Sequence, residues 1–354
     1  MKKVLYISNI SVPYRTAFFE KLGKVCNLTV LYERRKSANR NDSWENIRSK
    51  NYTIKYLDGR NIMDENGFSF KILKQLDRSY DCIIFGCYNS PVEIFAMLYM
   101  RLTHRKYALN IDGEIFEPHN KIKRWGRNFV LRGAALYLSA SSYAIPYICR
   151  VTHCENVIPY YFSSLSKEEI EQAVQSTAQR NDNILVVGQY EAYKGLDILL
   201  DVAKTLPDYT FHIVGMSKKH IAFEKLVHEK GVANVNVTPF LSKEELVNEY
   251  RTSKMIVLPS RQECWGLVIN EAAAYGTPIV STIGSGAAVE FLRGKYSQFL
   301  ARSDDVVDLS TKIKSLAQSN DIDIARYSEY LKRKSLDYSI EHMVEAHIDA
   351  IQSW

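Results

Sequence analysis

Residues 258–280 read LPSRQECWGLVINEAAAYGTPIV, and this stretch decides the architecture of its part of the chain. Apolar residues run up to Pro259, a loop follows, and helical spacing begins near Gly266 and stops before Gly276. A buried strand that passes through a loop into a helix is typical of a parallel sheet covered by helices. The free N–H groups at such a helix start, with a glycine that allows close approach, form an anion site suited to a diphosphate.

Two carboxylates lie in the same stretch. Glu263 falls at the tip of the loop, and Glu271 falls about one turn or more into the helix. Carboxylates do not bind phosphate, so sugar hydroxyl groups are their natural partners. Either residue alone is equally well explained as a solvated surface acid. Together with the helix start, they predict a site for a sugar carried on a diphosphate.

Apolar strand candidates alternate with amphipathic helical segments along the whole chain. The expected strands are residues 4–8, 28–32, 53–57, 82–85, 107–111 and 135–139, and then 184–187, 210–214, 235–238, 255–258 and 278–280. Their continuous apolar runs indicate strands buried on both faces. Proline and a serine cluster at 158–166 predict a linker. We therefore expect two Rossmann-like α/β domains: residues 1–163, joined by a C-terminal helix at 338–354, and residues 164–337.

The composition is that of an ordinary globular protein, with 46% hydrophobic and 24% charged residues among 354. No apolar run is long enough for a signal peptide core or a membrane span, so we expect a cytoplasmic protein. The six cysteines lack C-x-x-C pairs, and we expect thiols and no metal site. Residues 1–165 hold 25 Lys and Arg against 14 Asp and Glu. This basic half favours an anionic neighbour: an anionic lipid, a lipid-linked phosphate or a nucleic acid.

The spacing E-x₇-E between Glu263 and Glu271, with Trp-Gly-Leu after the first Glu and Tyr-Gly-Thr-Pro-Ile-Val after the helix, resembles the signature of glycosyltransferase family 4 (glycosyl transferases group 1). Members of this family are retaining nucleotide-sugar transferases of the GT-B fold, in which two Rossmann-like domains face each other across a cleft. The resemblance implies that Glu263 contacts the transferred sugar and that Glu271 holds the ribose hydroxyls. It also implies that the backbone at Gly266 and Leu267 meets the diphosphate.

A second segment, residues 186–197, is a strand, a loop and a helix start with a lysine at the turn. It resembles the family's G-R-x…K-G element, which makes Gly188 a donor-site residue and Lys194 the phosphate ligand; a plain surface lysine is the alternative. Gln189 stands where many members have arginine, and Arg261 is a candidate substitute for that cation. Phe240 follows a strand where relatives place the nucleotide base, although packing in the core explains it equally well.

The N-terminal half carries fewer explicit signals. The loop after the first strand leads through Tyr14 and Arg15 into a helix, and the resemblance implies acceptor binding there. The absence of G-x-G-x-x-G speaks against a dinucleotide cofactor. Asp112 ends another strand at the point where relatives have a polar residue facing the transferred sugar, and an ordinary turn aspartate is the alternative.

Residues 121–132 form a basic helix candidate interleaved with aromatic residues. Such a helix can lie on an anionic membrane with its rings in the interface. A solvated face with core-facing aromatics is the competing interpretation, and no nucleic-acid motif accompanies it. The residues of the predicted membrane patch are Lys121, Lys123, Arg124, Trp125 and Arg127.

The resemblance implies a retaining glycosyltransferase that moves a sugar from a nucleoside diphosphate sugar to an acceptor hydroxyl. No D-x-D constellation stands at an expected strand end, so we expect no metal requirement and no bound cofactor. The acceptor is expected to be a lipid-linked saccharide of a cell-surface polysaccharide, met at the inner face of the membrane. A GT-B nucleotide-sugar epimerase or hydrolase, and a non-catalytic nucleotide-sugar-binding protein, are the alternatives.

Overall fold

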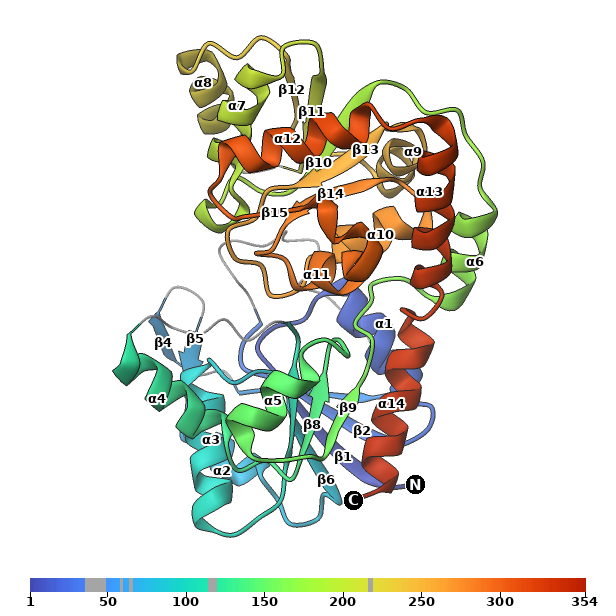
Figure 1. Ribbon diagram of the computed structural model, residues 1–354. Helices are drawn as coiled ribbons and strands as arrows, with labels where there is room; N and C mark the ends of the chain where they lie inside the picture. The colour runs from blue at the N-terminus through green and yellow to red at the C-terminus, as the bar shows by residue number, and fades with distance from the viewer. Residues whose placement is uncertain (36–48, 58–59, 64–65, 114–119, 216–218) are drawn as a thin grey trace. The chain divides into compact units, whose positions relative to one another are not determined.

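The computed structural model describes residues 1–35, 49–57, 60–63, 66–113, 120–215 and 219–354. They form two compact units. Unit 1 consists of Met1–Ser164 together with Ile340–Trp354, and unit 2 consists of Leu165–Ser339. Each unit is built on one parallel sheet flanked by helices (Figure 1). The predicted pair of Rossmann-like domains is therefore confirmed.

The sheet of unit 1 has seven parallel strands in the order β3-β2-β1-β6-β7-β8-β9. These strands are β1 (Lys3–Ser8), β2 (Asn27–Tyr32), β3 (Thr53–Tyr56), β6 (Cys82–Phe85), β7 (Ala108–Ile111), β8 (Leu136–Ser139) and β9 (Val157–Pro159), beside a separate antiparallel hairpin of β4 (Arg60–Met63) and β5 (Asn66–Phe68). Every residue of β6, β7 and β8 is buried. Continuous burial explains why most residues of these strands are apolar; Asn110 in β7 and Ser139 in β8 are the buried polar exceptions.

The helices of unit 1 include one that returns from the far end of the chain. They are α1 (Pro13–Leu22), α2 (Ile72–Gln75), α3 (Pro91–Leu102), α4 (Lys121–Leu131), α5 (Ile145–Thr152) and α14 (Ile340–Gln352). Helix α14 buries His347, whose ring lies 4.7 Å from that of Phe18 on α1. His347 also pairs with Met343 O through Nδ1 at 2.7 Å and with Asn110 Nδ2 through Nε2 at 3.3 Å.

The sheet of unit 2 has six parallel strands in the order β12-β11-β10-β13-β14-β15. The strands are β10 (Asn183–Val187), β11 (Thr210–Val214), β12 (Val235–Thr238), β13 (Met255–Leu258), β14 (Ile279–Thr282) and β15 (Leu300–Ala301). The helices are α6 (Lys167–Gln175), α7 (Leu196–Thr205), α8 (His220–Glu229), α9 (Lys243–Thr252), α10 (Leu267–Ala274), α11 (Gly286–Leu292), α12 (Val306–Ala317) and α13 (Asp321–Ser335).

Both sheets reverse their strand order beside the first strand of the unit. The reversal falls between β1 and β6 in unit 1, and between β10 and β13 in unit 2. Open α/β sheets bind ligands outside the carboxyl ends of the strands at such a switch point. We therefore expect a ligand site of unit 2 at the loops after β10 and β13.

The stretch 158–166, expected to be a linker, starts as regular structure. Val157–Pro159 pairs with β8 as strand β9, and Tyr160 and Phe162 behind it are buried. The proline that interrupts the apolar pattern is the last residue of this edge strand, where a missing N–H is tolerated. In the described part of the chain, every helix is too short or too polar to cross a membrane.

Candidate functional site

Lys194 and Glu263 meet at the switch point of unit 2. Lys194 ends a short 3₁₀ turn after β10, and Glu263 lies in the loop after β13. The Lys194 ammonium donates to Oε1 and Oε2 of Glu263 at 2.6 and 2.7 Å, and the Ser260 hydroxyl donates to Oε2 at 2.9 Å. The two charged side chains are 13% and 14% exposed, so a ligand can still reach them. The structure thus places Lys194, the residue expected to bind the phosphate, directly against Glu263, the residue expected to bind the sugar.

Two glycines make this approach of the two loops feasible. Gly195 has φ 67°, and a Cβ there would lie 2.1 Å from the carbonyl oxygen of Pro259. Gly266 has φ 101°, and a Cβ there would lie 2.8 Å from Ser285 Oγ. A larger residue at Gly195 would push the loop after β10 away from the loop after β13. A larger residue at Gly266 would push the start of α10 away from Ser285. The glycines therefore set the position of Lys194 and of the start of α10.

The start of α10 offers backbone donors beside the Lys194–Glu263 pair. Gly266 is its N-cap and makes no side-chain cap bond, and no acidic residue lies in the first turn. The first N–H groups of a helix have no partner within the helix, and the helix dipole favours an anion there. Trp265 anchors this turn by donating from its indole N–H to Asn270 Oδ1 at 2.8 Å. The predicted diphosphate contact at Gly266 and Leu267 is therefore chemically available.

Glu271 on α10 is oriented by Tyr250, a residue that no sequence pattern predicts to be functional. Tyr250, at the end of α9, donates its hydroxyl to Glu271 Oε2 at 2.7 Å. The Tyr250 ring is buried and stacks on Tyr275, with the centroids 6.1 Å apart. Burial, followed by the charge of Glu271, raises the pKa of Tyr250 well above its ordinary value, so the hydroxyl remains a donor. No motif marks Tyr250, because it reads as one more apolar position of an amphipathic helix.

Arg261 is engaged by two carboxylates. Its guanidinium donates to both oxygens of Asp197 at 2.8 Å and to Asp304 Oδ1 at 2.5 Å. The bond to Asp197, with that to Asp304, raises the pKa of Arg261 above its ordinary value. Arg261 therefore braces the loop after β13 against α7. Its predicted use as a phosphate cation in place of the arginine missing at Gln189 would require these ion pairs to open.

The remaining predicted donor residues lie at the same edge of the unit 2 sheet. Gly188 and Gln189 follow β10 directly. Gly188 is half-buried, Gln189 is exposed, and Phe240 follows β12 with 67% of its surface exposed. An exposed ring beyond a strand end is available to a ligand, and it does not pack in the core. By contrast, Glu290 on α11 is fully buried against Lys334 and Arg293, which gives it a structural role.

In unit 1, Asp112 and Arg15 form an ion pair at the carboxyl edge of the sheet. Arg15 on α1 is 6% exposed, donates to Asp112 Oδ2, and donates to the Tyr6 hydroxyl at 3.0 Å. Tyr160 donates to Asp112 Oδ1 at 2.5 Å. The Asp112 side chain remains 29% exposed. Arg15 is thus a buried positioning residue for Asp112, whereas its neighbour Tyr14 is half-buried and stands against Phe162.

The predicted membrane patch lies on α4 and exposes its aromatic residues. Trp125 is 70% exposed, stacks on Phe129 and lies one turn from Ile122, which is 79% exposed. The predicted cations Lys121 and Lys123 are exposed, and Arg124 is half-buried. Arg127 instead donates to the Tyr147 hydroxyl of α5 at 2.6 Å. The aromatics therefore face outward, unlike those of a helix that packs all its rings in a core.

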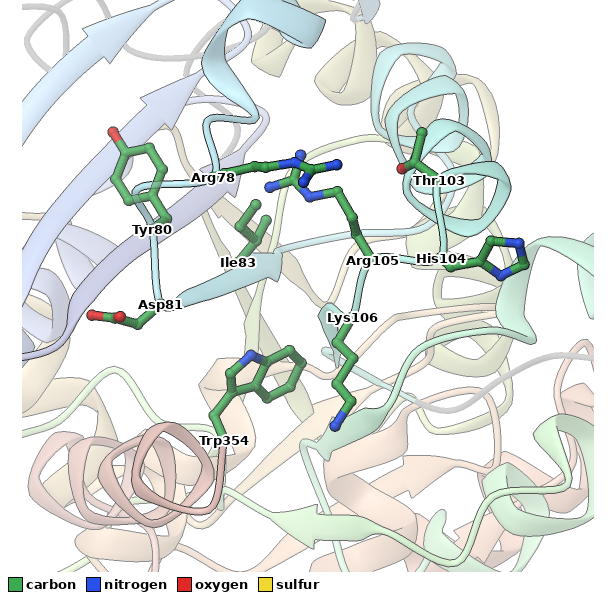
Figure 2. A pocket seen from close by; sticks show the side chains of 9 residues that line it. All are labelled: Arg78, Tyr80, Asp81, Ile83, Thr103, His104, Arg105, Lys106 and Trp354. Atoms are coloured by element: carbon green, nitrogen blue, oxygen red, sulfur yellow. The ribbon is translucent and has the colours of Figure 1, made fainter.

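A shallow basic cavity of about 360 Å³ lies elsewhere in unit 1, between the segments that lead into β6 and β7 (Figure 2). Arg78, His104, Arg105, Lys106 and Trp354 line it. Arg105 is committed to the carbonyl oxygens of Leu76 and Asp77. Because the cavity lies at the amino ends of the strands, it is separate from the edge that carries Asp112.

Comparison with known families identifies unit 2. Residues 167–335 match the model of the family described as glycosyl transferases group 1. Unit 2 belongs to the glycosyl transferases group 1 family. In this group 1 unit, the matched range contains both loops of the switch point, with Lys194, Glu263 and Glu271.

Relatives of known sequence match part of the chain. An uncharacterized 41.2 kDa protein in the cps region of Klebsiella pneumoniae is 28% identical over 242 residues, which cover 63% of this chain and 66% of that protein. Three further curated relatives are matched over 39%, 47% and 38% of their length. The chain thus spans two thirds of its relatives or less.

Solved structures resemble the whole chain. HepE of Anabaena, solved in complex with UDP, is 14% identical with a TM-score of 0.71 over 99% of this chain and 100% of that one. WaaG, a glycosyltransferase involved in lipopolysaccharide biosynthesis, is 13% identical with a TM-score of 0.65 over 98% and 99%. At this identity the likeness establishes the fold, which is GT-B.

Proposed function

We propose that this protein is a retaining glycosyltransferase that transfers a sugar from a nucleoside diphosphate sugar to an acceptor hydroxyl. The observation that carries the proposal is the Lys194–Glu263 pair beside the uncapped start of α10, within a group 1 unit. A cation, backbone donors and a sugar-reading carboxylate are thereby gathered at one switch point. HepE, which has the same fold, was solved with UDP.

In the proposed reaction, the bond between the anomeric carbon and the diphosphate breaks as the acceptor oxygen bonds to that carbon. Negative charge grows on the departing diphosphate, and Lys194 and the N–H groups of α10 stabilise it. A phosphate oxygen of the leaving group takes the acceptor proton, so no separate protein base is needed. Glu263 holds hydroxyls of the transferred sugar, and Glu271, oriented by Tyr250, holds those of the ribose. We assign these roles without a metal ion.

We assign acceptor binding to unit 1. The resemblance implies Tyr14 and Arg15 for the acceptor and sets Asp112 against the transferred sugar. Because Arg15 is buried against Asp112, we assign the reading of acceptor hydroxyls to Asp112. Asp112 keeps exposed surface while Arg15 and Tyr160 hold its carboxylate in place. The relative in a Klebsiella cps region and the fold shared with WaaG support a saccharide of a cell-surface polysaccharide as the acceptor. A lipid carrier for that saccharide would agree with the exposed apolar and basic face of α4.

A donor panel tests the central proposal. The full chain is mixed with UDP-, GDP- and other nucleotide sugars, and its thermal unfolding is followed with and without each. A donor present at 100 times its Kd stabilises the folded state by about 2.7 kcal/mol, which raises the melting temperature by several degrees. The absence of a shift with every nucleotide sugar would remove the donor site. Hydrolysis or epimerisation of the donor without a transferred product would favour the alternative enzyme classes.

Vesicle sedimentation tests the proposed membrane contact of α4. We expect the protein to pellet with anionic vesicles and to stay in solution with neutral ones, because the exposed lysines add to ring insertion. The double variant Lys121→Gln and Lys123→Gln and the variant Trp125→Ser should each weaken pelleting. Lys225→Gln, on an exposed face of α8 in unit 2, is the matched control. Equal pelleting of all four proteins would show that α4 is an ordinary solvated helix.

A further inference from the structure

Three side chains with metal-ligating atoms converge at the switch point of unit 1. Glu33 directly follows β2, Cys87 follows β6, and Glu93 lies in the first turn of α3. Strands β2 and β6 both pair with β1, so the ends of these two strands lie on either side of it. One ligand atom from each residue lies within 4.8 Å of the other two. This spacing is suitable for a single cation.

The two carboxylates are buried, the Cys87 thiol is half-buried, and the group is incompletely hydrogen-bonded. Glu33 is 1% exposed and Glu93 is 0% exposed. Glu93 accepts hydrogen bonds from the Cys87 N–H at 3.0 Å and from the Cys87 thiol at 3.3 Å. Neither oxygen of Glu33 has a hydrogen-bond partner among the described residues. Burying a carboxylate costs free energy unless it is paired or coordinates a metal. The two Glu33 oxygens therefore indicate a bound ligand.

Ser90 gives an independent indication that something belongs at this place. It is the N-cap residue of α3, where a serine hydroxyl normally bonds a free N–H of the first turn. The Ser90 hydroxyl makes no such bond, is 1% exposed, and has no other partner in the described residues. Instead it lies beside Glu33, where burial raises the pKa of the carboxyl and the Ser90 hydroxyl opposes that rise by a smaller amount. The buried Ser90 hydroxyl thus does not cap α3 and lies beside the cluster instead.

We propose that Glu33, Cys87 and Glu93 bind a divalent transition-metal cation of the zinc class. Zinc takes thiolate and carboxylate ligands in tetrahedral sites, and three protein ligands leave the fourth position to a water molecule. Two carboxylates and a thiolate carry three negative charges. A divalent cation neutralises two of them, and Arg34, which is 9% exposed and acts on Glu33, supplies the third positive charge. The site belongs to unit 1 and is independent of the proposed donor site.

Metal uptake must displace protons from this cluster. Burial raises the pKa of Glu33, and it raises the pKa values of Cys87 and Glu93 well above their ordinary values. Without a cation, the thiol and at least one carboxyl of the pair therefore hold protons. The binding step replaces these protons by metal–ligand bonds and releases them to the solvent. The cation would tie the ends of β2 and β6 to the start of α3.

Cobalt substitution tests the proposal without reference to enzymatic activity. The full chain is treated with chelator, dialysed and titrated with Co²⁺, and near-ultraviolet absorption is recorded. We expect a thiolate-to-cobalt charge-transfer band that saturates at one equivalent and is removed by Zn²⁺, with proton release in weakly buffered solution. Zn²⁺ should also raise the melting temperature. A chain that binds less than about one tenth of an equivalent and shows no band would overturn the proposal.

Variants locate the signal in the cluster. Cys87→Ser should abolish the charge-transfer band. Glu33→Gln should weaken Co²⁺ binding by at least about tenfold, because the loss of a group that only supports a metal ligand already costs about that much. Cys149→Ser, a half-buried thiol on α5, is the matched control and should keep the band. A band that survives in Cys87→Ser would show that the metal binds at another thiol. In that case, or without any band, the cluster is a pair of carboxyl groups that share a proton.

Discussion

The two units have the same kind of sheet, yet they build the edge of that sheet from differently distributed residues. In unit 2, the candidate donor site comes from two short loops, and one continuous stretch holds Glu263, the start of α10 and Glu271. In unit 1, the corresponding edge joins single residues from distant segments, such as Arg15, Asp112 and Tyr160. We therefore expect the site of unit 2 to lose function when one member is removed, and the network of unit 1 to lose it in smaller steps.

The largest effect should come from the concentrated site. Lys194→Ala removes the cation beside Glu263, and we expect turnover to fall about 10²- to 10³-fold, as for the loss of one preorganised group that stabilises transition-state charge. Sugar transfer from the donor identified in the panel is the measurement. Lys225→Ala, whose side chain is 76% exposed, should leave turnover unchanged. A Lys194→Ala enzyme of normal turnover would show that the α10 start suffices.

A smaller effect is expected at the far end of the same stretch. Glu271→Ala should weaken nucleotide binding about 10- to 100-fold, because hydrogen bonds to a charged group are worth about 1.5–3 kcal/mol. Tyr250→Phe should weaken it only a few-fold, since Tyr250 acts through Glu271. Calorimetric titration with the nucleotide measures both, with the exposed Glu244→Ala as control. If Tyr250→Phe costs as much as Glu271→Ala, then Tyr250 itself contacts the nucleotide.

The network of unit 1 should respond in a graded way. Tyr160→Phe removes one of the two side chains that hold Asp112, and we expect turnover to fall by about 5- to 10-fold, the value of one hydrogen bond of about 1 kcal/mol. Donor affinity should not change, because Tyr160 belongs to unit 1. Steady-state rates combined with nucleotide titration separate the two quantities. A loss of donor affinity in Tyr160→Phe would contradict the division of roles between the units.

The last prediction concerns the pH dependence of stability in unit 1, and not turnover. Burial lowers the pKa of His347 to about 3 in the folded chain, whereas an unfolded histidine titrates near 6.5. Between these values the unfolded chain binds more protons, so His347 costs stability as the pH falls below 6.5. At pH 5 this cost is about 2 kcal/mol.

The variant His347→Gln isolates that contribution. Glutamine keeps a polar side chain near Asn110 but does not titrate, so the stability difference between wild type and variant should change by about 2 kcal/mol between pH 7 and pH 5. Urea unfolding at each pH gives the two free energies. Parallel pH profiles for the two proteins would mean that His347 becomes protonated without unfolding of the unit.

Sequence patterns predicted much of unit 2 and less of unit 1. The strand, loop and helix of 258–280 are predictable because every step depends on neighbouring residues. The ion pair of Lys194 with Glu263 was not predicted, because it joins two loops that only the strand order brings together. Tyr160 was placed in a linker, since Pro159 masks a three-residue edge strand. Glu33, Cys87 and Glu93 form no motif, because three separate elements carry them.

Helix α14 has a consequence for the order in which the chain folds during synthesis. Nascent domains usually complete in the order in which the ribosome makes them. Here unit 2 is one continuous segment, whereas unit 1 needs Ile340–Trp354, the part made after unit 2 is finished. Until then the pocket that receives His347, against Phe18 and Asn110, lacks its occupant. We therefore expect unit 2 to complete its folding first, although it comes second in the sequence. Unit 1 completes its folding only when α14 has been synthesised.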